Sequence, residues 1–215
     1  MVIFAVDLKN ITIMKKIFTT LFIVLGLYGV ASAQVKEKGD TEFGVTLGLN
    51  TSYVSAYDGE STDATEGLNV GVAGDFYFSN RWSLKVKALY DQKGWGNGFI
   101  TDDQGNELDG VDFKLNYITI PVLANWHFGM HRNWYLDFGP YVGILTSAKA
   151  GGYDVKDSFA TTDVGFRVDL GVKFPISDRA KFFIEIGGQG GGTNVFKDGS
   201  TVQNETSSLN VGVNF

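Results

Sequence analysis

Nucleophilic catalysis by a serine or threonine needs a histidine base within reach, and this sequence contains only two histidines, His127 and His131. Both lie at or beside a short polar turn at 129–132. The chain has no cysteine, which excludes a cysteine nucleophile, thiolate metal ligands, disulfides and a lipid anchor on cysteine. Any histidine-dependent hydrolysis would therefore have to take place next to this one turn.

Acidic side chains gather in two polar stretches that could attract a cation. The first, 101–110, lacks the ligand spacing of a calcium loop because its alternation of acids fails at Gln104. Its centre, Asp-Gln-Gly-Asn, is an ordinary turn sequence. We predict no specific metal site, although loose divalent bridging to anionic surface lipids stays open for the second stretch. That stretch contains Asp58, Glu60, Asp63 and Glu66, with no Lys or Arg between them.

The glycine run at 187–192 has the composition of a phosphate-binding loop without its other parts. No Lys-Ser or Lys-Thr pair follows it, and no helix begins after it. We therefore predict that the chain binds no cofactor. The run is more typical of a bend or a loop at the end of a strand.

Composition bounds the kind of protein that carries these residues. The 215 residues are 44% hydrophobic and 20% charged, with 28 Gly, 14% aromatic residues and only 3 Pro. This mixture is typical of short β-strands in a folded chain rather than of disorder. The net charge of -6 argues against a nucleic-acid partner, which needs a basic surface.

The first 33 residues have the layout of a signal peptide. Lys15 and Lys16 precede an apolar run at 17–30, and Ala31-Ser32-Ala33 forms a cleavage site. The run is shorter than the ~20 residues of a membrane-spanning helix. Met14 is an alternative start, in which case 1–13 is an upstream extension. We expect 34–41 to form a short periplasmic segment before a barrel domain at 42–215.

From residue 42 onward, hydrophobic residues recur at every second position, as in half-buried strands. The connections alternate strictly between short turns and long polar stretches, so all long loops lie on one side. This pattern predicts an all-β fold, an eight-stranded antiparallel up-and-down transmembrane β-barrel. The expected strands are 42–52, 67–78, 82–92, 112–128, 133–147, 162–175, 181–190 and 206–215. The expected long loops are 53–66, 93–111, 148–161 and 191–205.

Aromatic positions indicate which face of the barrel meets lipid. A soluble barrel such as a lipocalin would turn the apolar face inward. The interior of eight strands could not hold nine large rings at one end. The rings instead fit an interfacial aromatic belt at the short-turn end of the outer face. Its members are Phe76, Phe78, Trp82, Trp126, Phe128, Trp134, Phe174, Phe182 and Phe215.

Charged residues occur in the middle of the strands on the opposite, polar face. Inside a narrow barrel such charges can pair, and Asp75 falls opposite Lys85 while Lys173 and Glu185 are near neighbours. We expect an evenly balanced lumen charge network of four acids and four bases, which would make the barrel conduct poorly. Its members are Asp75, Lys85, Lys87, Asp137, Arg167, Asp169, Lys173 and Glu185.

Three segments carry a resemblance to a known family. The runs at 117–123, 138–143 and 163–173 resemble the small outer-membrane β-barrel family of Bacteroidota, often called porin-like or PorT-like. The resemblance covers about 40–215. It implies a barrel in the outer membrane and no catalytic residue. PorT is a component of a secretion system, and no motif in this sequence selects that role.

These patterns predict a non-enzymatic integral outer-membrane protein with surface loops, either structural in the envelope or in contact with a ligand or an unidentified protein partner. We expect a monomer in outer-membrane lipids, inserted by the barrel-assembly machinery, whose signal the C-terminal pattern ending at Phe215 resembles. The alternatives are a small porin-like channel and a PorT-like accessory subunit of a secretion system. A lipid-modifying enzyme is disfavoured because both histidines lie on the short-turn side, and we predict no catalytic residue.

Overall fold

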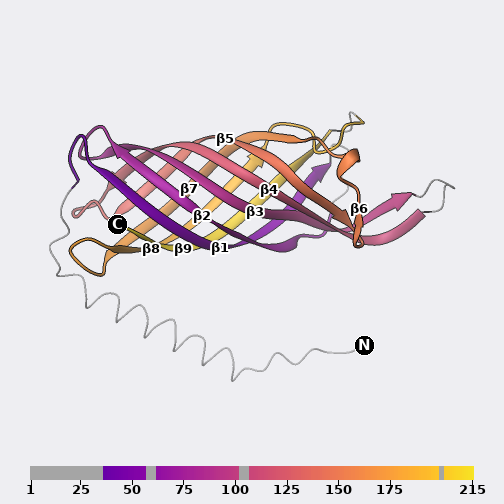
Figure 1. Ribbon diagram of the computed structural model, residues 1–215, viewed down its shortest axis with the longest axis horizontal. Helices are drawn as coiled ribbons and strands as arrows, with labels where there is room; N and C mark the ends of the chain where they lie inside the picture. The colour runs from indigo at the N-terminus through magenta and orange to yellow at the C-terminus, as the bar shows by residue number, and fades with distance from the viewer. Residues whose placement is uncertain (1–35, 57–61, 102–106, 199–200) are drawn as a thin grey trace, which may run out of the picture.

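The computed structural model describes residues 36–56, 62–101, 107–198 and 201–215. The predicted signal peptide at 1–33 and its extension at 1–13 lie outside the described residues. Nine strands and one short helical turn are described (Figure 1). They are β1 (Thr41–Ala56), β2 (Thr65–Tyr77), β3 (Trp82–Thr101), β4 (Glu107–Phe128), β5 (Trp134–Ala150), β6 (Tyr153–Asp154), η1 (Lys156–Ser158), β7 (Thr162–Pro175), β8 (Lys181–Gly191) and β9 (Val202–Asn214).

The long strands close into a barrel. Each pairs antiparallel with the next, β1 pairs with β9, and the order is β4-β3-β2-β1-β9-β8-β7-β5, closed by pairing of β4 with β5. The two-residue strand β6 adds only to β5. The prediction of a closed eight-stranded antiparallel barrel is thus confirmed. No described helix is long and apolar enough to cross a membrane.

The strands reach much farther into the expected long loops than the sequence indicates. Most of 93–111 is not a loop, since β3 and β4 continue pairing from Lys93 opposite Leu115 to Thr101 opposite Glu107. Register shifts between Trp95 and Phe99 break the alternation in this hairpin, where Asn97 takes a left-handed φ of 57°. A bulge adds a residue to one strand, so the period of two is lost although the strand goes on.

The two ends of the barrel differ in their connections. At one end the strands join through short turns closed by backbone hydrogen bonds, as from Phe78 N to Trp82 O (3.1 Å) and from Ile176 N to Ala180 O (2.9 Å). The long connections lie at the other end, with η1 and β6 among them (Figure 1). Both the described start of the chain and its C-terminus belong to the short-turn end.

The outer face of the barrel is apolar and the inner face polar. On β1 the outward Leu49 is 61% exposed, whereas its neighbour Asn50 is 2% exposed. This arrangement is the reverse of a lipocalin-type soluble barrel. The nine rings named above all lie on the outer face at the short-turn end, and six of them stack on a neighbouring ring of the set. The Trp82 ring stacks on Trp126 at 6.2 Å and the Phe128 ring on Trp134 at 6.4 Å.

Inward-facing glycines make room for large lumen side chains. A Cβ at Gly171 would overlap the ring of Tyr135, which is itself buried. We expect Gly171→Ala to lower the free energy of unfolding by about 1–3 kcal/mol through overpacking, measured by denaturant titration in vesicles. Gly188→Ala is the control, because its Cβ would meet only Thr206 O at 4.0 Å. Equal stability of both variants would contradict this packing.

Candidate functional site

The eight charged residues that the sequence places on the polar face all lie inside the barrel, each no more than 4% exposed. Their centre is the ammonium group of Lys87. Its Nζ lies 2.8 Å from Asp169 Oδ2, 2.7 Å from Glu185 Oε1 and 3.9 Å from Asp137 Oδ2. One cation is thus shared by three carboxylates that come from three different strands.

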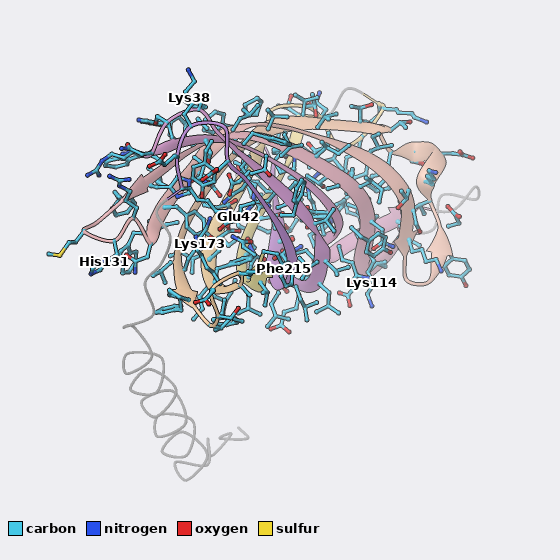
Figure 2. All side chains as sticks on the ribbon, turned by 60° about the vertical axis from the view of Figure 1, so that its left-hand side comes forward. Lys38, Glu42, Lys114, His131, Lys173 and Phe215 are labelled. Atoms are coloured by element: carbon cyan, nitrogen blue, oxygen red, sulfur yellow. The ribbon has the colours of Figure 1, made fainter. Side chains whose placement is uncertain are left out.

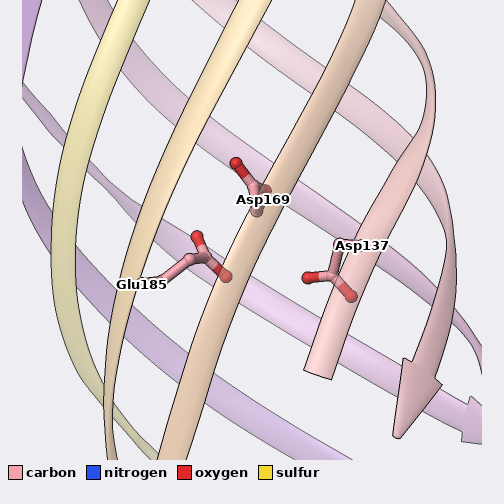
Figure 3. A group of neighbouring side chains, drawn as sticks. All are labelled: Asp137, Asp169 and Glu185. Carbon is pink, nitrogen blue, oxygen red and sulfur yellow. The ribbon is translucent and has the colours of Figure 1, made fainter. Parts of the chain in front are cut away.

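These three carboxylates form the one group with metal-ligand spacing among the described residues. One oxygen of each lies within 4.8 Å of the others, and Figure 3 shows Asp137, Asp169 and Glu185 facing a common space. Three buried acids need a compensating cation. Three side-chain cations already compensate them, because Lys85 lies 2.7 Å from Asp137, Lys87 lies 2.7 Å from Glu185 and Arg167 lies 2.8 Å from Asp169.

Further ion pairs extend this cluster around the lumen. Lys85 Nζ lies 2.7 Å from Asp137 Oδ2 and 3.6 Å from Asp75 Oδ2. Asp75 is indeed the cross-strand partner of Lys85, but the shorter contact is to the more distant strand. Arg167 Nε lies 2.8 Å from Asp169 Oδ2, and its Nη1 donates to Gln189 Oε1 at 3.0 Å.

The expected proximity of Lys173 and Glu185 does not produce an ion pair. Lys173 pairs with Glu42 and lies 3.6 Å from Asp75 Oδ2. Glu185 accepts hydrogen bonds from Lys87, from Tyr135 OH at 3.0 Å and from Asn210 Nδ2 at 3.1 Å. Lys173 stands opposite Phe183 on β8, so the cross-strand position of Lys173 is two residues away from Glu185. Figure 2 places Lys173 and Glu42 together inside the barrel.

Four further buried charges were not predicted from the sequence: Glu42, Asp91, Lys93 and Asp163. Lys93 Nζ lies 3.0 Å from Asp163 Oδ2, and Asp91 accepts hydrogen bonds from Asn50 and Thr119. Each occupies the polar-face position of its strand, so strict alternation could have found them. Among the described residues the lumen therefore holds seven buried acids and five buried bases, and the expected even balance is wrong.

A chain of asparagines joins these charges to the central cluster. Asn69 Nδ2 donates to Asn50 Oδ1 at 2.8 Å and to Asn210 Oδ1 at 2.9 Å. Asn50 in turn donates to Asp91, and Asn210 donates to Glu185. Neutral amides thus add donors to acids that also have a basic partner, Lys93 for Asp91 and Lys87 for Glu185, since amide donors stabilise a buried carboxylate. The lumen is one connected polar network.

His127 lies in the lumen wall and does not form a catalytic triad. Ser83 Oγ is 3.0 Å from His127 Nε2 and donates to Asp75 Oδ1 at 2.9 Å. In a triad the carboxylate orients the histidine, whereas here it accepts a hydrogen bond from the serine, which is 0% exposed. His131 lies outside the lumen, exposed in the neighbouring turn.

The long-connection half of the lumen is closed by apolar side chains, contrary to the expected solvated loops. Trp95 stacks on Phe113 at 4.5 Å, and Phe159 packs on Phe196 at 4.8 Å. Phe159 and Phe196 also form an isolated β-bridge between two connections. Segments 93–111, 148–161 and 191–205 thus contribute a buried cluster as well as surface. Their apolar residues are too few and too scattered to show a period.

The acidic stretches contribute no described metal cluster. Asp63 is exposed and pairs through its backbone with Gly96, and Glu66 is exposed at the start of β2. Glu107 and Asp109 belong to β4, where Asp109 is exposed. Asp58, Glu60, Asp102 and Asp103 lie outside the described residues.

Comparison with known proteins gives a family and a set of similar folds. Residues 32–197 match the family model described as "Outer membrane protein beta-barrel domain". Ail, the attachment invasion locus protein of Yersinia pestis, is 19% identical, with 83% of this chain and 99% of that chain covered and a TM-score of 0.47. Neisserial surface protein A is 19% identical, with 80% and 95% covered and a TM-score of 0.49. The outer membrane protease OmpT from Escherichia coli is 8% identical, with 87% and 99% covered and a TM-score of 0.36. No curated protein matches the chain.

Proposed function

The chain belongs to the outer membrane protein beta-barrel domain family, and from this membership we propose that it acts as a closed, non-enzymatic barrel that holds its long connections at the cell surface. An outer-membrane location follows from the family. In such barrels the short turns face the periplasm and the long loops face outside. The barrel is then a scaffold, and the connections between its strands meet the surroundings.

The closed lumen is the observation that carries this proposal. Ions would meet the Lys87 cluster in one half and the stacked Trp95 and Phe113 rings in the other. Opening the first barrier means separating buried ion pairs, which leaves uncompensated charges at a cost of several kcal/mol. An eight-stranded barrel has an interior just wide enough to be filled by side chains. The porin-like alternative therefore has little support from the lumen.

The proposed absence of enzymatic activity is supported by the positions of the two histidines. His127 is buried against Ser83 and Tyr77 near the short-turn end of β4. His131 lies at the short-turn end, away from the long connections. Neither could act on lipid or peptide at the outer surface.

Charge distribution suggests what the surface connections present. Beyond residue 33 the chain has 15 Lys and Arg and 23 Asp and Glu. At the described long-connection end the exposed acids outnumber the exposed lysines, with Asp63, Glu66, Asp109, Asp112, Asp154, Asp157 and Asp198 against Lys114, Lys149, Lys156 and Lys197. We propose that these connections contact cationic groups or divalent ions at the cell surface.

Single-channel recording on refolded protein tests the closed barrel. We expect wild-type protein to show no large, stable conductance, because the network and the apolar cluster block the lumen. Asp75→Ala and Glu185→Ala each remove a carboxylate from the network and should increase brief leakage events. Glu66→Ala, an exposed acid on β2, is the control and should match wild type. A large, stable wild-type conductance would favour the channel instead.

A further inference from the structure

A small pocket with a cavity volume of about 30 Å³ opens at the short-turn mouth of the barrel, beneath the ionic network. The turn at 129–133, the segment before β1 and the ends of β7 and β8 surround it. Its basic lining residues are Lys36, His131, Arg132, Lys173 and Lys181, with His127 deeper in the wall. None of the described residues that line it is an Asp or a Glu.

The cations around the pocket are only partly compensated by neighbouring acids. Lys173 and Lys181 share Glu42, with Lys181 Nζ 3.0 Å from Glu42 Oε1. Lys36 Nζ donates to the backbone oxygen of Thr41 at 3.1 Å, and no described carboxylate lies within ion-pair distance of it. The pocket is therefore electropositive in a chain that is acidic as a whole.

Arg132 has a guanidinium group whose donors are free to bind an anion. Its guanidinium forms no ion pair and no side-chain hydrogen bond with any described residue, although the residue is half-buried. Its backbone is in the left-handed region at φ 53°, which residues other than Gly, Asn and Asp adopt rarely. The turn thus keeps an arginine with free donors at the wall of an enclosed pocket.

Neutral donors complete the lining. Asn80 and Asn133 contribute amides, whereas the Tyr77 hydroxyl in the same wall already donates to Glu42 Oε2 at 3.5 Å. A planar guanidinium matches two oxygens of an oxyanion at once. A phosphate group carries up to two negative charges and several acceptor oxygens. A phosphate group therefore matches two uncompensated cations and donors on several sides better than a single carboxylate does.

We propose that the short-turn mouth of the barrel is a binding site for a phosphate group, held by Arg132 and Lys36 with the neutral donors of the pocket wall. The network behind Lys173 closes the inner end, so the ligand enters only from the short-turn side. In the proposed orientation this side is the periplasm. The phosphate belongs either to a soluble phosphate compound or to the headgroup of an anionic lipid in the adjoining leaflet.

Calorimetric titration with inorganic phosphate tests the site on protein purified from outer membranes into a non-ionic detergent. We expect saturable binding of one phosphate per chain. The double variant Lys36→Gln/Arg132→Gln should weaken it at least about tenfold, because two charge-assisted contacts are lost. Arg179→Gln is the matched control, since it removes an arginine from another short turn that does not line the pocket.

The outcomes separate a specific site from general attraction. Absence of saturable binding, or equal weakening by Arg179→Gln, would overturn the proposal. All variants should keep the shift in gel mobility on heating that marks a folded barrel, because the changed residues lie outside the strands. Phosphate binding is measured independently of conductance, so either the binding site or the closed lumen can be contradicted without the other.

The source of the phosphate is settled by changing the lipid. Protein in nanodiscs of neutral lipid is compared with protein in nanodiscs containing phosphatidylglycerol, at equal ionic strength. If a headgroup fills the site, the apparent affinity of the wild-type protein for inorganic phosphate should fall about tenfold or more in the anionic discs. The affinity of the double variant should be the same in both kinds of disc. Unchanged wild-type affinity would assign the site to a soluble phosphate compound.

Discussion

Replacing Lys87 by Met is expected to lower the free energy of unfolding by about 3–5 kcal/mol, since removal of one partner from a buried ion pair leaves the other uncompensated. Here the loss affects two carboxylates at hydrogen-bond distance, those of Asp169 and Glu185. Methionine has a similar length and shape to lysine, so the change tests the charge rather than the volume. Urea titration of the refolded barrel in vesicles measures it.

Two further variants make this prediction specific. Lys114→Met makes the same chemical change at an exposed position on β4, opposite Lys149, and should alter stability by less than about 0.5 kcal/mol. Combining Lys87→Met with Glu185→Gln removes one of the two carboxylate charges left without the ammonium group and should recover part of the lost free energy of unfolding. If Lys87→Met costs no more than Lys114→Met, the ammonium group does not hold the lumen network together.

The second large effect is expected on the outer face, where Val168→Arg should cost about 2–4 kcal/mol. Val168 is 44% exposed near the middle of β7, at the depth of the hydrocarbon core in the proposed orientation. A guanidinium there has no water and no acidic partner. Unfolding titrations in vesicles measure the loss, and a spin label at 168 should report contact with lipid.

The control for this prediction is a substitution to arginine at a different membrane depth. Ile176→Arg makes a comparable substitution in a short turn, where the residue is 57% exposed, and should cost only about 0–1 kcal/mol near the interface. Equal costs at 168 and 176 would contradict the lipid-facing assignment of β7. A water-accessible label at 168 would contradict it as well.

Local alternation, together with the alternating loop lengths and the aromatic positions, was enough to predict the closed barrel and the face on which the side chains of its regular strands lie. In a strand the side-chain direction reverses at every residue, so one apolar position fixes its neighbours. This is why Lys85, Lys87 and Arg167 could be placed on the polar face without coordinates. The cross-strand partner of Lys85 also followed, because a short turn fixes the register of a hairpin.

Strand ends and the apolar cluster could not be predicted in this way. At the bulge near Trp95 the period of two is lost, so the predicted end of β3 at 92 is nine residues too early. Phe159 and Phe196 come from separate connections, and each is the lone Phe of a largely polar stretch. Their burial depends on the two connections meeting over the end of the barrel.

The identity of the partners across the lumen was decided only by the tertiary structure. Lys87 contacts Glu185, 98 residues away, and Lys85 contacts Asp137, 52 residues away. Alternation says that a side chain points inward but not at which height along the barrel it meets another strand. That height depends on the tilt and stagger of the strands when the sheet closes, which is a property of all eight strands together. The sequence by itself therefore determined a polar lumen, and closure of the barrel determined which charges share it.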